Sequence, residues 1–271
     1  MQSHFPLRPI GGDFEDSQAL LAVNPTRKAV IFIHGYSGDS LTTWQQFDIL
    51  LPQETKSSGH DLYFYGYDGL YSDMVASSAI FANFLKSILK TPLLLIGRVL
   101  PGSVNRDQQF EYDEVIIVAH SLGAVIARWA LLDLHDNETP GLNRFRMILF
   151  APAHRGARVD RLAAAIGSGI PLLGFITTAF RFKSPLVEQL GEHSVFLEDL
   201  QQRTNDAILA VGKQPYLVAH CVCIAEYEKI VTNLKFAQDP PAIAIPKKDH
   251  TGLCKPNAAW RLPLDEVLRG L

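Results

Sequence analysis

The sixteen residues 115–130, "VIIVAHSLGAVIARWA", constrain the fold more than any other part of the chain. They begin with an unbroken run of apolar, mostly β-branched residues (115–118), which is typical of a buried strand. Further on, apolar residues recur at helical spacing, at Val125, Ile126, Trp129 and Ala130. Only a few residues, most of them small, separate the two patterns, and Ser121 stands among them. The segment therefore predicts a strand that passes into a helix through a tight turn at Ser121.

The same alternation of short apolar runs and helical patterns recurs along the chain. The predicted strands are residues 29–33, 62–67, 114–118, 146–151 and 216–225. Strands alternating with helices indicate an α/β fold with a mainly parallel sheet buried on both faces. The stretch between the last two strands is too long for a simple crossover, so we expect a helical cap insertion at about 155–212. The simplest organisation is one domain over residues 1–271.

Composition excludes several classes of function. The 271 residues carry a net charge of −3, which provides no electrostatic basis for binding nucleic acid or an anionic membrane. No strand is followed by G-x-G-x-x-G or G-K-[ST], so a nucleotide site is not expected. No run approaches the roughly 18 apolar residues of a spanning helix, and the N-terminus lacks a secretory pattern. The three cysteines cannot all pair, which favours buried thiols in a reducing compartment. We therefore expect a cytoplasmic protein.

Ser121 has the surroundings of a catalytic nucleophile. Ala119 and Gly123 stand two residues before and after it. A serine at a tight strand-to-helix turn needs small residues at these positions because the strand and helix backbones nearly touch there. The usual pattern is G-x-S-x-G, and alanine is small enough to replace the first glycine. A serine here could instead cap the helix N-terminus, but the preceding strand and following helix favour the nucleophile.

The first predicted strand leads into a glycine-rich loop that begins with His34 and Gly35. An acyl-transfer enzyme stabilises an oxyanion, usually with two backbone N–H donors. We predict that these are the amides of Tyr36 and Leu122, with Gly35 allowing close approach of the loop. The alternative is an ordinary turn with a structural His34, which the neighbouring serine turn makes less favoured.

The general base should be one of the nine histidines. His34 and His120 belong to the two turns and are better placed to shape them. His220 falls inside a predicted strand and is expected to be buried. His250 lies in the polar loop "IPKKDHTGLCKP" after the last strand, which fits the chain order serine, acid, histidine of this type of enzyme. We predict His250 as the base. Of the remaining histidines, His154 lies near the site but early in the chain, and nothing in the sequence supports His4, His60, His135 or His193.

The acid of the triad should follow a late strand and lie between the serine and the histidine. The segment "IAEYEKIVTN" offers Glu228 and Glu226, and Asp160 follows the preceding strand. We rank Glu228 first, then Glu226, then Asp160, with Asp249 beside the histidine as a further carboxylate. The alternative for each is an ordinary surface carboxylate, and for Glu226 that alternative is favoured at least as much.

Four segments together resemble the lipase-like serine esterases of the α/β-hydrolase superfamily, within a branch of GPI inositol-deacylase-like and mitochondrial serine-active-site-containing proteins. They are "VIFIHGYSGDSLTTW", "VIIVAHSLGAVIARWAL", "ILFAPAHRGA" and "DHTGLCKP". The resemblance covers about residues 28–260, with 160–210 poorly matched. It implies the α/β-hydrolase fold, backbone oxyanion donors at Tyr36 and Leu122, and an acid in a segment like G-x-x-D-x-I-V-P. That segment aligns with residues 225–232 and places Glu228 at the acid, with glutamate for aspartate and threonine for proline.

These observations predict a two-step serine hydrolase acting on carboxylic esters. The apolar segments 88–100 and 166–180 would flank the site as lids and form an acyl-binding pocket, which would favour lipid-like substrates and lipid contact. Alternatively, they pack against the core or a second copy. A thioesterase or acyltransferase would use the same triad, and a non-catalytic binding module would keep only the fold. We expect no cofactor, and no metal, because His220, Cys221 and Cys223 would face both sides of one strand. The oligomeric state stays open.

Overall fold

Eight strands of the described chain form one sheet in the order β1-β2-β4-β3-β5-β6-β7-β8. The computed structural model describes residues 3–69, 72–102, 106–158, 161, 189–192 and 194–271. The strands are β1 (Arg8–Gly11), β2 (Phe14–Leu20), β3 (Lys28–Ile33), β4 (Asp61–Tyr65), β5 (Glu114–His120), β6 (Phe145–Phe150), β7 (Cys221–Ala225) and β8 (Ile243–Ile245). All pairs from β4 to β8 are parallel, and β1 and β2 add an antiparallel edge. The predicted α/β class with a mainly parallel sheet is confirmed.

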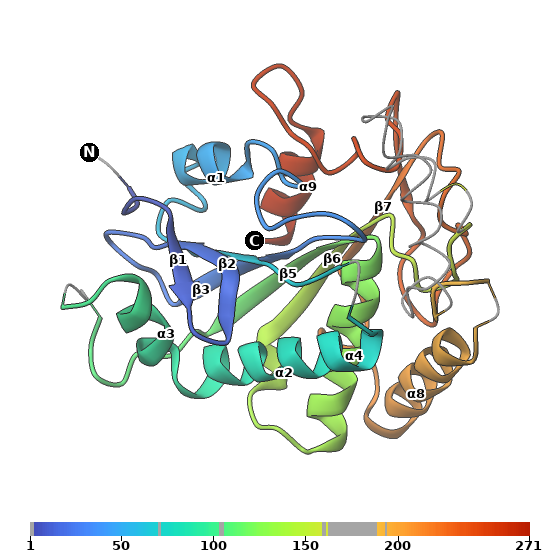
Figure 1. The fold of residues 1–271 in the computed structure, drawn as a ribbon, viewed down its shortest axis with the longest axis horizontal. Coiled ribbons are helices and arrows are strands. Elements are labelled where there is room, and N and C mark those ends of the chain that lie inside the picture. The colour runs from blue at the N-terminus through green and yellow to red at the C-terminus, as the bar shows by residue number, and fades with distance from the viewer. Residues whose placement is uncertain (1–2, 70–71, 103–105, 159–160, 162–188, 193) are drawn as a thin grey trace.

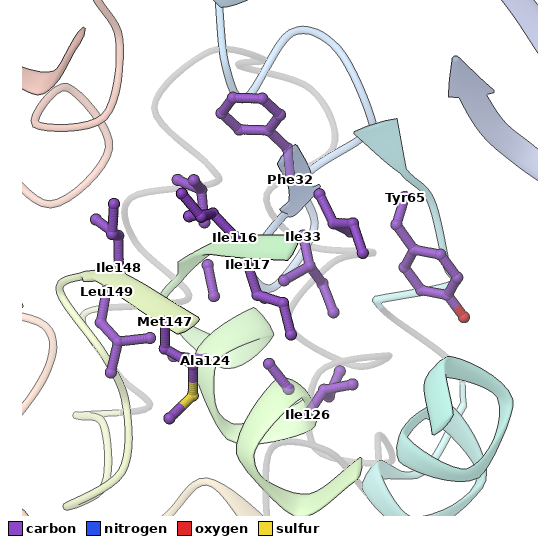
Figure 2. Close-up of a cluster of buried hydrophobic side chains, with 14 of the residues drawn as sticks. Phe32, Ile33, Tyr65, Ile116, Ile117, Ala124, Ile126, Met147, Ile148 and Leu149 are labelled. Carbon is purple, nitrogen blue, oxygen red and sulfur yellow. The ribbon is translucent and has the colours of Figure 1, made fainter. Parts of the chain in front are cut away.

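The central strands are apolar because helices cover both of their faces. Figure 2 shows Ile117 and Met147 pointing towards α4 (Leu122–Asp136). Phe32, Ile116 and Ile148 point to the opposite face. This alternation follows from the period of two along a strand, and all five side chains are fully or almost fully buried. The sheet centre is therefore a rigid platform for the loops that follow β3, β5 and β7.

The helices form layers on the two faces of the sheet. The remaining helical segments are α1 (Phe47–Leu50), η1 (Leu51–Gln53), α2 (Met74–Lys90), α3 (Pro92–Val99), η2 (Leu142–Arg144), α8 (Val195–Val211) and α9 (Leu262–Gly270). Figure 1 shows α1 and α9 on one side of the sheet and α2 and α4 on the other. The α8 helix lies in the predicted insertion 155–212 and packs against α4, with the rings of Phe196 and Trp129 stacked at 4.0 Å.

The apolar segment 88–100 does not flank the predicted site, so its interpretation as a lid is wrong. It comprises the end of α2 and all of α3, which contacts β1 and α2. Leu95, Ile96 and Val99 are buried there, so the apolar character serves core packing. The second segment, 166–180, lies outside the described residues. Within the described chain, no single helix has the length and composition to cross a bilayer, and only the α2–α3 pair, bent by 100°, meets both criteria together.

The region before β7 differs from the prediction. The strand begins at Cys221 because pairing with β6 starts there, at Ile148. Residues 216–219 form a turn instead, and His220 is exposed rather than buried in a strand. Cys221 and Cys223 do face the same side, with sulfur atoms 3.6 Å apart, and both thiols are buried and free.

Candidate active site

Ser121 is the single residue that joins β5 to α4. Its backbone angles, φ of 53° and ψ of −118°, lie in a region that residues other than glycine rarely adopt. Such a conformation costs about 1–3 kcal/mol and persists only where the surroundings impose it. The Ser121 amide donates to the carbonyl of Phe150 at 3.0 Å, and the Ser121 carbonyl accepts from the amide of Ala153 at 3.2 Å. The end of β6 thus fixes the serine backbone from both sides.

Two glycines let the serine turn interlock with the loop after β3. A Cβ added to Gly123 would stand 2.3 Å from the carbonyl oxygen of His34 and 2.5 Å from that of Ile33. A Cβ added to Gly35 would stand 2.9 Å from the Cβ of Ser121. Ala119, in contrast, fits as a fully buried residue of β5. The small residues around Ser121 therefore reflect real backbone proximity.

The structure brings Ser121, His250 and Glu228 into one hydrogen-bonded chain. His250 Nε2 lies 3.0 Å from Ser121 Oγ, and His250 Nδ1 lies 3.0 Å from Glu228 Oε2. The side chains of His250 and Glu228 are only 4% and 5% exposed. Because the carboxylate can only accept, Nδ1 carries the proton and Nε2 is left to accept from the serine hydroxyl. Three residues from distant parts of the chain thus form the arrangement of a nucleophile, a base and an orienting acid.

The loop backbone holds the Glu228 carboxylate in place. Its second oxygen, Oε1, accepts from the amides of Ile230 at 2.8 Å and Val231 at 3.1 Å. Burial alone would raise the pKa of Glu228, but the hydrogen bond and charge of His250 and these amides outweigh it and hold the pKa below its ordinary value. Glu228 therefore stays ionised beside the imidazole at neutral pH.

The other predicted acids are placed differently. The exposed Glu226 accepts from the amide of Lys247 at 2.8 Å, so it stabilises the turn after β8. Asp249 accepts from the amide of Gly252 and the hydroxyl of Thr251, within its own turn. Asp160 lies outside the described residues. Among the described candidates, Glu228 is the carboxylate that reaches His250.

His34 and His120 contact the backbone of the loops around the site. His120 Nε2 lies 2.9 Å from the carbonyl oxygen of His250 and holds the loop that carries the base. Burial, followed by the neighbouring His250, lowers the pKa of His120 to about 3, so the ring is neutral. The His34 ring stacks on Tyr67 at 4.3 Å, with Nδ1 2.9 Å from the Gly35 carbonyl oxygen. Both rings are part of the frame of the site.

A cavity of about 310 Å³ opens onto Ser121 and His250. Its described lining is mostly polar and comes from the loop after β3, the serine turn and the two late loops. It consists of Gly35, Tyr36, Ser37, Gly38, Asp39, Thr42, Thr43, His120, Ser121, Ile230, His250, Thr251 and Lys255. The predicted oxyanion donors lie at this cavity: Tyr36 lines it, and Leu122 is the first residue of α4, where helix amides lack intrahelical partners.

The sequence analysis missed a second buried polar group, Arg128, Asp239 and His154, which we name the arginine cluster. Arg128 is 1% exposed and donates to Asp239 at 2.6 Å and to the carbonyl of Leu217 at 2.6 Å. His154 Nε2 lies 3.0 Å from the carbonyl oxygen of Ala124. Burial and the Arg128 charge lower the pKa of His154 well below its ordinary value. The available signal was a lone arginine inside the otherwise apolar run of α4.

The sequence analysis also missed Lys255, which lines the cavity five residues after the predicted base. Its signal in the sequence was its place in the segment "DHTGLCKP". Among the described residues, no group of three or more His, Cys, Asp or Glu side chains could hold a metal ion.

Comparison with known proteins identifies the fold. No protein-family model and no curated protein sequence matches the chain. Solved structures do match over nearly its whole length. The mature lipase BlEst2 of Bacillus licheniformis has 17% identity and a TM-score of 0.55, covering 96% of this chain and 99% of its own.

Two further structures have similar coverage. YbtT, a type II thioesterase of the yersiniabactin pathway, has 13% identity and a TM-score of 0.56, covering 97% and 96% of the two chains. MGS-MChE2, an α/β-hydrolase enzyme from a lagoon-sediment metagenome, has 13% identity and a TM-score of 0.54, covering 98% and 99%. The chain therefore has the α/β-hydrolase fold, as its sequence motifs predicted.

Proposed function

We propose that this protein is a serine hydrolase that cleaves carboxylic esters through Ser121, His250 and Glu228. The observation that carries the proposal is the continuous hydrogen-bonded chain from Glu228 through His250 to a hydroxyl held on a strained turn. A strained residue kept at the rim of a cavity is a feature of functional sites rather than of packing. The α/β-hydrolase fold supports the proposal because its nucleophile stands at this strand-to-helix turn.

The proposed reaction has two steps, acylation of Ser121 and hydrolysis of the acyl-enzyme. Ser121 Oγ attacks the ester carbonyl carbon while His250 Nε2 takes the hydroxyl proton, and the carbonyl electron pair moves onto the oxygen. When this pair returns, the C–O bond of the ester breaks and His250 delivers its proton to the leaving alcohol. Water then attacks the acyl-enzyme with His250 again as the base, which releases the acid and restores Ser121. Glu228 keeps the imidazole in the required tautomer throughout.

The developing oxyanion would be stabilised by backbone amides. We assign this role to the N–H groups of Tyr36 and Leu122, which flank the serine from the loop after β3 and from the start of α4. Removing one such donor typically costs 10²–10³-fold in rate. Gly35 makes the close approach possible because any side chain there would contact Ser121.

The described part of the cavity favours short esters over long acyl chains. Its volume is about 310 Å³, and its lining combines hydroxyl, carboxylate and ammonium groups with apolar surface that includes Ile230. A chain-length series of 4-nitrophenyl esters tests this directly. We expect kcat/KM to be highest for acetate or butyrate and to fall for octanoate, and a maximum at octanoate would favour a lipid substrate instead.

Labelling with a fluorophosphonate probe tests the catalytic assignment. The wild type should be labelled on Ser121 and should hydrolyse 4-nitrophenyl acetate, whereas Ser121→Ala and His250→Ala should lose both properties. Ser37→Ala is the matched control because Ser37 lines the same cavity, and it should keep both. A folded wild type that is neither labelled nor active would support a non-catalytic binding module.

A further inference from the structure

Lys255 stands out among the residues that line the catalytic cavity. Its side chain is half-buried, and within the described chain no hydrogen bond or ion pair engages its ammonium group. An ammonium that is partly removed from water without a partner has lost hydration that a bound anion would replace. The group is therefore available to a ligand in the cavity.

The backbone that carries Lys255 is fixed relative to the proposed triad. The amide of Lys255 donates to the carbonyl of Gly252 at 3.2 Å, and the amide of Leu253 donates to the carbonyl of Asp249 at 3.2 Å. The buried thiol of Cys254 contacts the carbonyl of Thr43 at 3.6 Å, which ties this loop to the loop after β3. The position of the ammonium is thus linked to that of His250.

The other charges near the cavity are already engaged. The Asp39 carboxylate accepts from the amides of Leu41 and Thr42, both at 2.8 Å, and from the Thr42 hydroxyl, so its own turn satisfies it. Glu228 is bound to His250 and to two amides. Lys248, on the same loop as Lys255, places its ammonium 3.8 Å from the centre of the Trp260 ring and does not line the described cavity. Among the described residues, Lys255 is the lysine or arginine that lines the cavity.

We infer that Lys255 binds an anionic group, a carboxylate or a phosphate, on the ester that Ser121 attacks. This inference rests on the proposed function and narrows its substrate class to anionic esters. The Thr43 hydroxyl lines the same cavity, accepts from the amide of Asp39 at 3.2 Å and keeps its own proton to donate to a further anion oxygen. Lys255 is a specificity-determining residue for these substrates, since charge-assisted hydrogen bonds are stronger than neutral ones.

Matched pairs of esters test the inference and locate the anion. The first pair places a charge on the acyl side, 4-nitrophenyl hemisuccinate against 4-nitrophenyl butyrate. The second places it on the alcohol side, 4-acetoxybenzoate against its methyl ester. The enzymes are the wild type, Lys255→Gln and the control Lys248→Gln, which removes the same charge from the same loop. Rates are taken above the Ser121→Ala background, which removes spontaneous hydrolysis.

In one of the two pairs, the anionic group of the ester should lie close enough to contact Lys255. For that anionic ester, Lys255→Gln should lower kcat/KM about tenfold, mainly by raising KM. The neutral ester should be unaffected, and Lys248→Gln should behave as the wild type. Unchanged anionic-to-neutral ratios in both pairs would overturn the inference while leaving the hydrolase intact. A wild type that cleaves no ester and resists fluorophosphonate labelling would instead overturn the proposed function.

A binding measurement separates affinity from turnover. By calorimetry, the Ser121→Ala protein should bind the preferred anionic ester about tenfold more tightly than Ser121→Ala/Lys255→Gln. Equal affinity of the two proteins would contradict a direct role of Lys255 in binding the anion. The same titration at higher ionic strength should weaken binding to the first protein more than to the second, because salt screens the added charge pair.

Discussion

Two buried polar networks lie at α4, one through Arg128 within the helix and one through Ser121 directly before it, and they differ in where their hydrogen bonds end. In the arginine cluster, both charged groups are hydrogen-bonded to partners within the fold. Arg128 donates to Asp239 and to a backbone carbonyl, and Asp239 also accepts from the amide of Ala219. In the proposed triad, the series of hydrogen bonds runs from Glu228 through His250 to the hydroxyl of Ser121, which lines a cavity. Each network has a carboxylate and an imidazole, and both are buried.

The comparison shows that burial and charge do not by themselves mark a catalytic site. Burial and a neighbouring cation both lower the pKa of His154 well below its ordinary value. Yet its hydrogen-bond partners are Arg128 and the carbonyl of Ala124, and in the described structure no hydroxyl group is hydrogen-bonded to it. What distinguishes the triad is an ordered set of donors and acceptors with a reactive atom at its open end. The following variants test this distinction.

The largest effect is expected for Glu228→Gln. The amide can donate to His250 Nδ1 and so favours the tautomer in which Nε2 cannot accept the serine proton. By analogy with triads in general, kcat should fall on the order of 10³–10⁴-fold with little change in fold. Glu226→Gln is the control, since the carboxylate of the exposed Glu226 accepts from the amide of Lys247, and it should remain active. A loss of activity in the control alone would reverse the assignment of the acid.

Arg128→Met should act on stability rather than on chemistry. Removing the cation leaves Asp239 charged and buried without its ion-pair partner, which typically costs about 3–5 kcal/mol in the free energy of unfolding. Urea denaturation measures this loss. Arg146→Met is the control because Arg146 is 45% exposed in its pair with Glu114, and such a pair contributes about 1 kcal/mol or less. Similar unfolding midpoints for both variants would remove the contrast between the networks.

A smaller effect concerns pH. The folded pKa of Glu228 lies below its ordinary value, so ionisation of this group stabilises the fold at any pH above the unfolded pKa of about 4.3. The stabilisation is lost as pH falls through the lower, folded pKa. The difference in Tm between the wild type and Glu228→Gln should therefore be constant near neutrality and shrink in acid. A difference that grows as pH falls would contradict this sign.

The smallest effect is expected for Ala119→Gly, which restores the usual glycine two residues before the serine. Ala119 is buried within β5 without a clash, so its replacement should cost about 0.5–1 kcal/mol of stability through backbone entropy. Turnover of 4-nitrophenyl acetate should remain close to that of the wild type. A large gain in activity would mean that the alanine distorts the serine turn.

Two residues of the proposed site stand out in the sequence, for different reasons. Ser121 lies between a strong strand pattern and a helical pattern, whereas His250 lies in a late polar loop that fits the chain order serine, acid, histidine. The choice between Glu226 and Glu228 could only be ranked, since both flank the same turn. Their difference comes from the amides of Ile230, Val231 and Lys247, whose directions depend on the folded loops.

Other features were beyond the sequence pattern for physical reasons. The edge strand β2 carries charged residues and β8 has only three residues, two of them exposed, so neither shows a buried apolar run. The strand predicted at 216–225 was too long because its first half is apolar for another reason: it packs as a turn around Arg128 and Asp239. These contacts join residues about 20 and 89 positions apart, and local periodicity does not encode them.

The interlocked glycines have a consequence for how such a site can change over generations. Gly123 faces the carbonyls at the end of β3, and Gly35 faces Ser121. A side chain at Gly123 would collide with the loop after β3, and a side chain at Gly35 would collide with the serine turn. A single substitution at either glycine is therefore not tolerated unless the facing segment also changes. Descendants of this chain can diversify the rim of the cavity one residue at a time, but the nucleophile and its facing loop must be inherited or rebuilt as one unit.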